Sequence, residues 1–210
     1  MIRVLLVDDH PILRRGLREI LVSGLESVVC GEAENSQEVL EQVQSNAWDL
    51  VILDINLPGR SGLEVLGDLR RLRPKLPVLV LSMHAEDQYA RRLLKAGACG
   101  YLRKETAPEE LIAAVRKVVT GGRYVSPTLA EKLVLDLDAD AEAPTHERLS
   151  DREFEILRLI GSGKQVSQIA EELHLSVTTI STYRARILEK LNLSTTAELV
   201  RYAVRNNLVE

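Results

Sequence analysis

The segment Leu50-Val51-Ile52-Leu53-Asp54 decides the fold, because it is a short apolar run that ends in one acidic residue. Similar apolar and partly β-branched runs occur at 2–7, 27–32, 78–82 and 98–102. Amphipathic stretches with helical spacing lie between and after them, at 11–22, 35–44, 61–73, 86–96 and 108–120. Strands that are apolar on both faces and alternate with helices form a parallel sheet covered on both sides. We therefore predict an α/β domain over residues 1–122, a doubly wound five-stranded parallel sheet.

The rest of the chain has a different character. Residues 123–147 are predicted to be a linker, since 126–147 carry 1 basic and 6 acidic side chains and few core residues. Residues 148–210 show helical spacing only, with helices expected at 151–160, 165–173, 176–191 and 195–207. The two helices around Gln168 to Ser176 are joined by a tight turn, which is helix-turn-helix geometry. A small all-α domain is therefore expected at the end of the chain.

Composition limits the classes of protein that fit. The chain has 210 residues, 45% hydrophobic and 28% charged, with a net charge of −4, which is typical of a globular protein and excludes collagen and long disordered chains. No apolar run approaches the ~20 residues that cross a bilayer. Charge at Arg3, Asp8 and Asp9 interrupts the segment that a signal peptide would keep apolar. We expect a cytoplasmic protein without a membrane partner.

Chemistry-bearing residues stand where the predicted strands end. The first strand is followed by Asp8 and Asp9, the third ends at Asp54, the fourth ends at Ser82, and the fifth leads through Tyr101 to Lys104. Ligands of an open parallel sheet bind at the carboxyl ends of its strands. Three carboxylates that converge there repel one another unless a cation neutralises them, and Mg²⁺ is suited to such a cluster. The Lys104 ammonium and the Ser82 hydroxyl suit a phosphoryl group.

The motifs Val7-Asp8-Asp9-His10, Leu53-Asp54, Leu81-Ser82 and Tyr101-Leu102-Arg103-Lys104 resemble those of the flavodoxin-like receiver domain of two-component response regulators. The resemblance implies that Asp54 accepts a phosphoryl group from a sensor histidine kinase. It also implies that Asp9, Asp54 and the backbone carbonyl of Asn56 bind Mg²⁺, with Asp8 assisting through water. Lys104 would pair with the phosphoryl group, and Ser82 and Tyr101 would form the switch. Glu105 stands where many receivers have proline, which leaves both a trans and a cis peptide after Lys104 open.

Enzyme classes fit the motifs less well. A phosphatase of the haloacid dehalogenase class also uses a strand-end aspartate and Mg²⁺, but it needs a second aspartate two residues later, where this chain has Asn56. A nucleotide-binding loop is mimicked by Gly161 to Lys164, but Arg158 replaces its first glycine and Gln165 its Ser or Thr. We expect a phosphoacceptor regulator, with at most self-catalysed phosphotransfer and slow autodephosphorylation.

The second domain resembles the LuxR-type helix-turn-helix of NarL/FixJ response regulators, in Leu149 to Glu153, Gly163 to Ala170, Leu175 to Ile180 and Leu188 to Leu191. Helical spacing puts Ile180, Tyr183, Ile187 and Leu191 in a core stripe and small polar residues opposite. A recognition helix of this kind enters the major groove of double-stranded DNA. The residues predicted to contact bases are Ser181, Thr182 and Ala185, and those predicted to contact phosphates are Thr178, Thr179, Arg184, Arg186 and Lys190, joined by Lys164 and Gln165 at the preceding helix.

Two further questions stay open in the sequence. An output domain of this size could instead bind RNA or protein, but only 3% of the residues are aromatic, and RNA-binding modules use stacking aromatics, so DNA is preferred. The last helix carries Leu199, Val200, Ala203 and Val204, more apolar surface than three helices need. It either dimerises, as in the family, or packs on residues 154–160. A homodimer is expected in the phosphorylated or DNA-bound protein.

Overall fold

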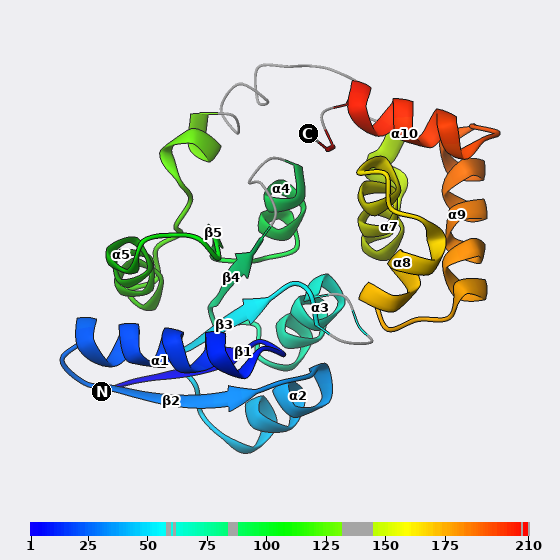
Figure 1. Cartoon of the computed structure of the whole chain (residues 1–210). Helices are drawn as coiled ribbons and strands as arrows, with labels where there is room; N and C mark the ends of the chain where they lie inside the picture. Colours follow the sequence, from blue (N-terminus) through cyan, green and yellow to red (C-terminus); the bar gives the residue numbers. More distant parts are fainter. Residues whose placement is uncertain (58–59, 61, 84–87, 132–144, 207, 210) are drawn as a thin grey trace. The chain divides into compact units, whose positions relative to one another are not determined.

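The computed structural model describes residues 1–57, 60, 62–83, 88–131, 145–206 and 208–209. The chain folds into two compact units, Met1–Asp138 and Ala139–Glu210, which are described separately below (Figure 1). In the described parts of the chain, every helix is too short or too polar to cross a membrane.

The first unit is built on one five-stranded sheet. Its strands are β1 (Ile2–Val7), β2 (Val28–Ala33), β3 (Leu50–Asp54), β4 (Val78–Ser82) and β5 (Gly100–Arg103). They lie in the order β2-β1-β3-β4-β5, and every pair is parallel. Val7 is paired with Leu53, and Asp54 with Leu81, so the strands end together at one edge. The strand order reverses between β1 and β3, where ligands of such sheets bind.

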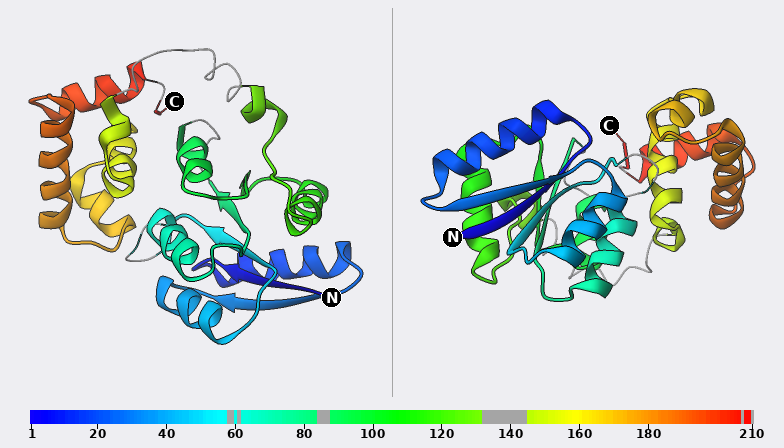
Figure 2. Two further views of the ribbon diagram at one scale, coloured as in Figure 1. Left: turned by 180° about the vertical axis from the view of Figure 1, so that it is seen from behind. Right: turned by 90° about the horizontal axis from the view of Figure 1, so that it is seen from below.

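Helices cover both faces of this sheet. They are α1 (Pro11–Gly24), α2 (Ser36–Ser45), α3 (Gly62–Leu72), α4 (Gln88–Lys95) and α5 (Pro108–Val119). In the left-hand view of Figure 2, α1 and α5 lie together, and α2 and α3 lie together on the other side of the sheet. The residues of β3 and β4 are buried throughout, as expected for central strands covered on both faces. This confirms the predicted doubly wound sheet.

The second unit is a small helical domain. It contains a short 3₁₀ helix η1 (Thr145–Arg148) and the helices α7 (Asp151–Gly161), α8 (Val166–Glu172), α9 (Val177–Leu191) and α10 (Thr196–Arg205). The helices α7, α8 and α9 pack on one another around buried side chains such as Phe154, Ile169 and Ile187, and α10 packs on α7. Ser176 caps α9 by accepting a hydrogen bond from the backbone N–H of Thr179, which ends the tight turn after α8.

The structure narrows the predicted linker of 123–147 at both ends. Tyr124 pairs with Gly100 beside β5, and Leu129 is buried, so the first unit extends beyond residue 122. At the other end, His146 is 2% exposed, stacks on Phe154 and lies 3.0 Å from the hydroxyl of Tyr202. The buried side chains of Leu129 and His146 thus belong to the folded units, although the segment between the two units is acidic. Within the predicted linker, residues 132–144 lie outside the described residues.

Candidate functional site

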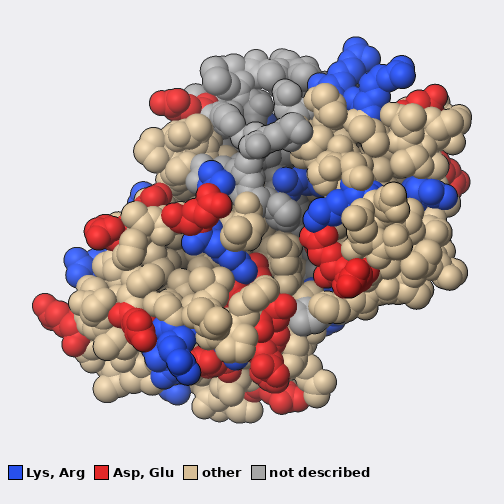
Figure 3. Space-filling model, in the orientation of Figure 1, with Lys and Arg blue, Asp and Glu red and all other residues tan. Residues whose placement is uncertain are grey.

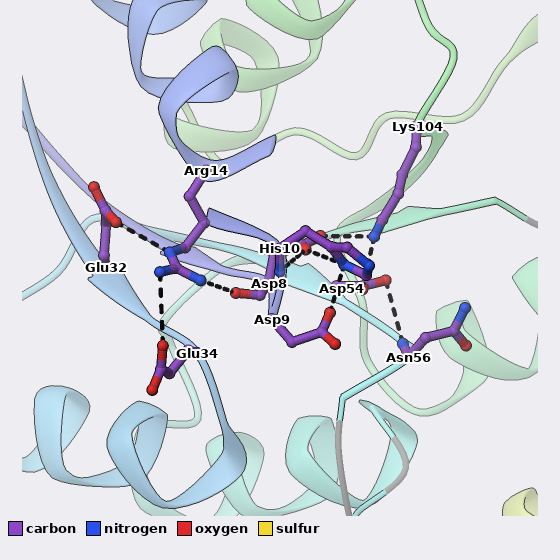
Figure 4. Close-up of polar contacts among 9 residues, drawn as sticks. All are labelled: Asp8, Asp9, His10, Arg14, Glu32, Glu34, Asp54, Asn56 and Lys104. Carbon is purple, nitrogen blue, oxygen red and sulfur yellow. Dashed lines mark hydrogen bonds and ion pairs between the residues drawn. The ribbon is translucent and has the colours of Figure 1, made fainter. Parts of the chain in front are cut away.

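Two buried carboxylates meet at the carboxyl edge of the sheet, where the strand order reverses. Asp8 follows β1 and Asp54 ends β3, and each is 1% exposed. The ammonium of Lys104, which follows β5, donates to both: its Nζ lies 2.6 Å from Asp8 Oδ2 and 2.7 Å from Asp54 Oδ2 (Figure 4). The structure thus brings together three of the residues predicted from the strand ends.

The charges at this site are strongly coupled. Burial raises the pKa of Asp54 to about 6, and the nearby Asp8 adds to the rise, while Lys104 and the Asn56 backbone N–H act against it. Burial favours the neutral form of Lys104, but the two carboxylates outweigh it, and the pKa of Lys104 is raised. At neutral pH the site therefore holds an ionised Asp54 next to a charged Lys104. A buried, ionised carboxylate with one cationic partner is poised to act as a nucleophile.

Asp9 and His10 complete the acidic side of the pocket. The side-chain oxygens of Asp8 and Asp9 and a ring nitrogen of His10 lie within 4.8 Å of one another. His10 Nδ1 lies 3.1 Å from Asp8 Oδ1 and 2.7 Å from Asp9 Oδ1, and the Asp9 Oδ1 atom is buried. Two carboxylates whose oxygens lie this close together fit a hard cation, which offsets their repulsion. The residues present therefore suit Mg²⁺.

The residues predicted to form the switch lie beside the same site. Ser82 ends β4 and Tyr101 lies in β5, and both are fully buried. The backbone N–H of Lys104 donates to the Ser82 carbonyl at 2.8 Å, which ties the lysine to the end of β4. No cis peptide bond occurs in the described residues, so the peptide between Lys104 and Glu105 is trans and the open alternative at this position is resolved.

Sequence reasoning missed Arg14. This side chain projects from α1 and is 8% exposed, and its Nη1 donates to the backbone carbonyl of Asp8 at 2.5 Å (Figure 4). Its partner Glu32 lies in β2, far away in sequence. An arginine at an amphipathic helix position is ordinarily solvated, so helical spacing alone carries no sign of this contact.

In the second unit, α9 has the face expected of a recognition helix. Thr178, Thr182, Ala185 and Arg186 are exposed, while Thr179, Ser181 and Arg184 are partly exposed. The opposite face packs inward through Ile180, Ile187 and Leu191, which are buried. Tyr183, predicted to belong to this core stripe, is only partly buried. A small and polar outer face lets a helix approach base edges closely.

Several of the predicted DNA contacts also have partners inside the domain. Lys190 Nζ lies 2.7 Å from Glu153 Oε2, and Lys164 Nζ lies 2.5 Å from Glu172 Oε2. The Thr179 hydroxyl lies 2.7 Å from the hydroxyl of the capping residue Ser176. Gln165 caps α8. Contact with a phosphate would require these side chains to give up an internal partner, whereas Arg186 is exposed.

Charge by itself does not mark the DNA-binding surface. Acidic and basic side chains are interspersed over the visible face of the first unit in Figure 3. In the second unit, residues 148–210 carry 9 basic and 8 acidic side chains, so any attraction to DNA depends on local placement. The helix α9 contains one acidic residue, Glu189, and three basic ones: Arg184, Arg186 and Lys190.

Two family models match the chain. Residues 4–116 match the response regulator receiver domain, and residues 147–203 match the luxR family of bacterial regulatory proteins. The first match contains the strand-end residues, and the second contains α7 to α9 and most of α10. Together they leave a short segment between residues 116 and 147 outside both families.

Relatives share both parts in the same order. Response regulator UvrY of Escherichia coli is 36% identical over 211 residues, which cover 99% of this chain and 96% of the relative. Response regulator GacA of Pseudomonas protegens is 39% identical over 212 residues, which cover 100% of this chain and 99% of the relative.

Solved structures agree with these relatives. RcsB from Salmonella enterica serovar Typhimurium, bound to a promoter in the presence of the phosphomimetic BeF₃⁻, is 28% identical and has a TM-score of 0.59 over 96% of this chain and 97% of its own. A structure of two RcsB dimers bound to two parallel DNAs is 26% identical, with a TM-score of 0.62 over 97% of this chain and 98% of its own. The chain therefore belongs to the two-component response regulators of the NarL/FixJ family, DNA-binding transcription regulators with a receiver domain and a LuxR-type helix-turn-helix domain.

Proposed function

We propose that a sensor histidine kinase phosphorylates this regulator on Asp54 and that the phosphorylated protein controls transcription by sequence-specific DNA binding through α9. The observation that carries the proposal is the pair of buried contacts from Lys104 to Asp54 and Asp8 at the carboxyl edge of the sheet. In this arrangement the receiver domain would be phosphorylated and the helix-turn-helix domain would bind DNA.

The reaction is a transfer between two side chains. A carboxylate oxygen of Asp54 attacks the phosphorus of a phosphohistidine, an O–P bond forms, the N–P bond breaks, and the electron pair returns to the kinase imidazole. Lys104, already within 2.7 Å of Asp54, offsets the negative charge on the transferred group. Asn56 stands where a phosphatase would carry its acid/base aspartate. We therefore expect self-catalysed transfer and slow autodephosphorylation, and no rapid turnover of phosphate esters.

Mg²⁺ would bind on the acidic side of the pocket. Asp9, Asp54 and the backbone carbonyl of Asn56 would be its ligands, and Asp8 would assist through water. When bound, the ion neutralises phosphoryl oxygens. The cluster of Asp8, Asp9 and His10 ligand atoms within 4.8 Å of one another supports this assignment.

Intact mass spectrometry tests the phosphoacceptor. Incubation with a small phosphodonor and Mg²⁺ should add one phosphoryl group to the wild type and none to Asp54→Ala. Asp68→Asn, which removes a carboxylate ion-paired with Arg71 on α3, is the matched control and should keep the gain. Asp9→Ala should abolish the gain at low Mg²⁺, and excess Mg²⁺ should rescue it only partly. A gain that survives Asp54→Ala would refute the assignment.

We propose that some residues of α9 contact the base edges of DNA and that others contact its phosphates. Ser181, Thr182 and Ala185 would contact base edges. Thr178, Thr179, Arg184, Arg186 and Lys190 would contact phosphates, with Lys164 and Gln165 adding backbone contacts. Thr182→Ala should cost about 1–3 kcal/mol at one base pair and relax the preference there. Arg186→Ala should weaken all sequences alike and reduce the salt slope by about one unit.

The test is a binding series on an operator and its single-base variants at several salt concentrations. Val177→Ser, an exposed apolar residue at the start of α9, serves as a control for changes that alter the helix start alone. Identical behaviour of Thr182→Ala and Arg186→Ala in both readouts would contradict the proposed docking.

The proposed assembly is a homodimer in the phosphorylated or DNA-bound state, formed in the cytoplasm. Of the apolar residues of α10, Leu199 and Ala203 are fully buried in their own domain, whereas Val204 is 53% exposed. Packing on α7 therefore uses only part of the apolar surface of this helix. The RcsB dimers on DNA support a dimer for this chain. Ser82 and Tyr101 would couple phosphorylation to dimer formation.

A further inference from the structure

We propose that Arg14 is a positioning residue of the phosphorylation site, which holds the Asp8-Asp9 segment in the orientation that metal binding requires. The inference rests on the proposed function, since it assigns the residue that orients the proposed metal ligands.

Arg14 is held between α1, the end of β1 and β2. Its Nε donates to Glu32 Oε2 at 3.0 Å, and its Nη1 donates to the Asp8 carbonyl at 2.5 Å. Its Nη2 lies 3.8 Å from Glu34 Oε2 (Figure 4). The planar guanidinium can make these contacts in three directions at once, which a lysine ammonium on a flexible stem cannot.

These contacts fix the backbone that carries the proposed metal ligands. The Asp8 N–H donates to the Ala33 carbonyl at 3.2 Å, and the Asp8 carbonyl accepts from Arg14. The same carbonyl belongs to the peptide that leads into Asp9. With both sides of Asp8 bound, its carboxylate points toward Lys104 and the Asp9 carboxylate lies beside it. Partners one step behind the ligands of a metal site orient those ligands, and their loss typically lowers metal affinity about 10–100-fold.

An alternative is that Arg14 serves only as an ion pair between α1 and β2. Arg18 distinguishes the two explanations, because it lies one turn later on α1 and bonds to the other oxygen of the same Glu32, but is 44% exposed at its side chain. In the described part of the chain, the Asp8 carbonyl accepts a hydrogen bond from the Arg14 side chain and not from Arg18. If an α1–β2 ion pair were all that mattered, both arginines would have comparable effects on the site.

The experiment compares Arg14→Met with Arg18→Met in the full-length protein. Mn²⁺ is the probe, and its binding is followed by the electron paramagnetic resonance signal of the free ion, which needs no phosphorylation. Arg14→Met should weaken Mn²⁺ binding about tenfold or more. Arg18→Met should leave it within about twofold of wild type, as expected for an exposed ion pair. Equal Mn²⁺ affinities of the two folded variants would overturn the proposal.

Phosphorylation at increasing Mg²⁺ gives a second readout. For Arg14→Met, the Mg²⁺ concentration at half-maximal rate should rise by about the same tenfold factor, whereas the rate at saturating Mg²⁺ should fall less. A loss confined to the saturated rate would contradict a role in orienting metal ligands. Should Arg14→Met fail to fold, Arg14→Lys takes its place. This variant keeps the positive charge but loses the planar set of guanidinium N–H donors. It should bind Mn²⁺ about threefold or more weakly than the wild type.

The wild type separates this proposal from the one on which it rests. Wild-type protein that neither binds Mn²⁺ nor gains a phosphoryl group on Asp54 refutes the proposed phosphorylation site. Wild-type protein that does both, next to an Arg14→Lys variant with wild-type Mn²⁺ affinity, refutes only the role of Arg14.

Discussion

At the scale of single residues, the Lys104 ammonium balances the charges of the two buried carboxylates at the site. This side chain is 8% exposed and contacts two carboxylates that are 2% and 1% exposed. Removing charges from water is costly, and their mutual attraction offsets that cost only while every partner is present. The site is therefore held in a charged state by one ammonium group, which makes it sensitive to any change of charge.

Lys104→Met should destabilise the receiver strongly. It leaves Asp8 and Asp54 buried side by side without a counter-charge, and breaking a buried pair in this way costs about 3–5 kcal/mol. The free energy of unfolding in urea, measured at pH 7 without Mg²⁺, checks this. The control is Arg103→Met, which removes an ion pair with Glu105 whose side chains are 46% and 61% exposed and should cost less than about 1 kcal/mol. Similar costs for the two variants would mean that water reaches the pocket freely.

At the scale of helices and strands, the second unit shows how a cap is linked to the rest of a domain. Ser150 and Glu153 form a capping box at the start of α7. Glu153 also accepts from Lys190 of α9, so one carboxylate closes the helix start and binds the neighbouring helix. Burial acts to raise the pKa of Glu153, but the hydrogen bonds from Lys190 and Ser150 outweigh it, and the pKa is lowered below that of an ordinary glutamate.

This lowered pKa makes the stability of α7 depend on pH. An acid whose pKa is lowered by folding contributes stability above its unfolded pKa, here 4.5, and the contribution is lost as the pH falls through the folded pKa. Glu153→Gln should therefore lower the free energy of protection of α7 amides at pH 7 by about 1–2 kcal/mol. In the wild type this protection should fall further below pH ~4.5, and the variant should lack most of that fall. Hydrogen exchange of the full-length protein, corrected for the intrinsic rate, measures both.

Glu172→Gln is the matched control for this change, because Glu172 pairs with Lys164 at side-chain exposures of 42% and 39%. It should change amide protection by less than about 1 kcal/mol. If Glu153→Gln shows the same pH dependence as the wild type, another group titrates in its place.

Gly100 offers a second test at this scale, at the point where Tyr124 joins β5. A Cβ at Gly100 would lie 2.7 Å from the Tyr124 carbonyl oxygen and 2.8 Å from Leu79 Cδ1. Gly100→Ala should therefore displace the segment at Tyr124 and cost about 1–3 kcal/mol of receiver stability in urea unfolding. Gly67→Ala on α3 is the control: a Cβ there meets nothing within 4 Å, so the change should stabilise the helix by about 0.5–1 kcal/mol. A neutral Gly100→Ala would mean that Tyr124 is not held against β5 in solution.

At the scale of the whole molecule, the chain divides into two units that each bury a core of their own. The division lies between the two family matches, which end at residue 116 and begin at residue 147. A regulator with two separate units can transmit a signal by shifting the equilibrium between different arrangements of its domains. The segment between them is acidic and poor in core residues.

Limited proteolysis of the full-length protein should cleave first within the acidic stretch 138–147 and release two folded fragments. The C-terminal fragment should bind DNA weakly, because it lacks the regulated dimer expected of the whole protein. Mass spectrometry of the fragments and a gel-shift titration measure the two outcomes. Resistance of this segment to protease would show that the domains are docked, and phosphorylation would then be expected to separate them.

The sequence by itself determined the order of elements and the residues at the strand ends. The strands 2–7, 50–54 and 78–82 were predicted with the bounds that the structure has, because short apolar runs rich in β-branched residues between amphipathic helices are typical of buried strands. Asp8, Asp54 and Lys104 followed from the same pattern, since parallel strands end at a common edge.

Only the tertiary structure decided the contacts that join segments distant in the chain. The bond from Arg14 to the Asp8 carbonyl, the pairing of Tyr124 with Gly100, and the pairing of Lys190 with Glu153 each depend on which elements become neighbours. Local periodicity shows which face of a helix is apolar, but it does not show which polar group lies opposite a given side chain. That information arises when the chain packs, because burial then requires every charge and backbone group to find a partner.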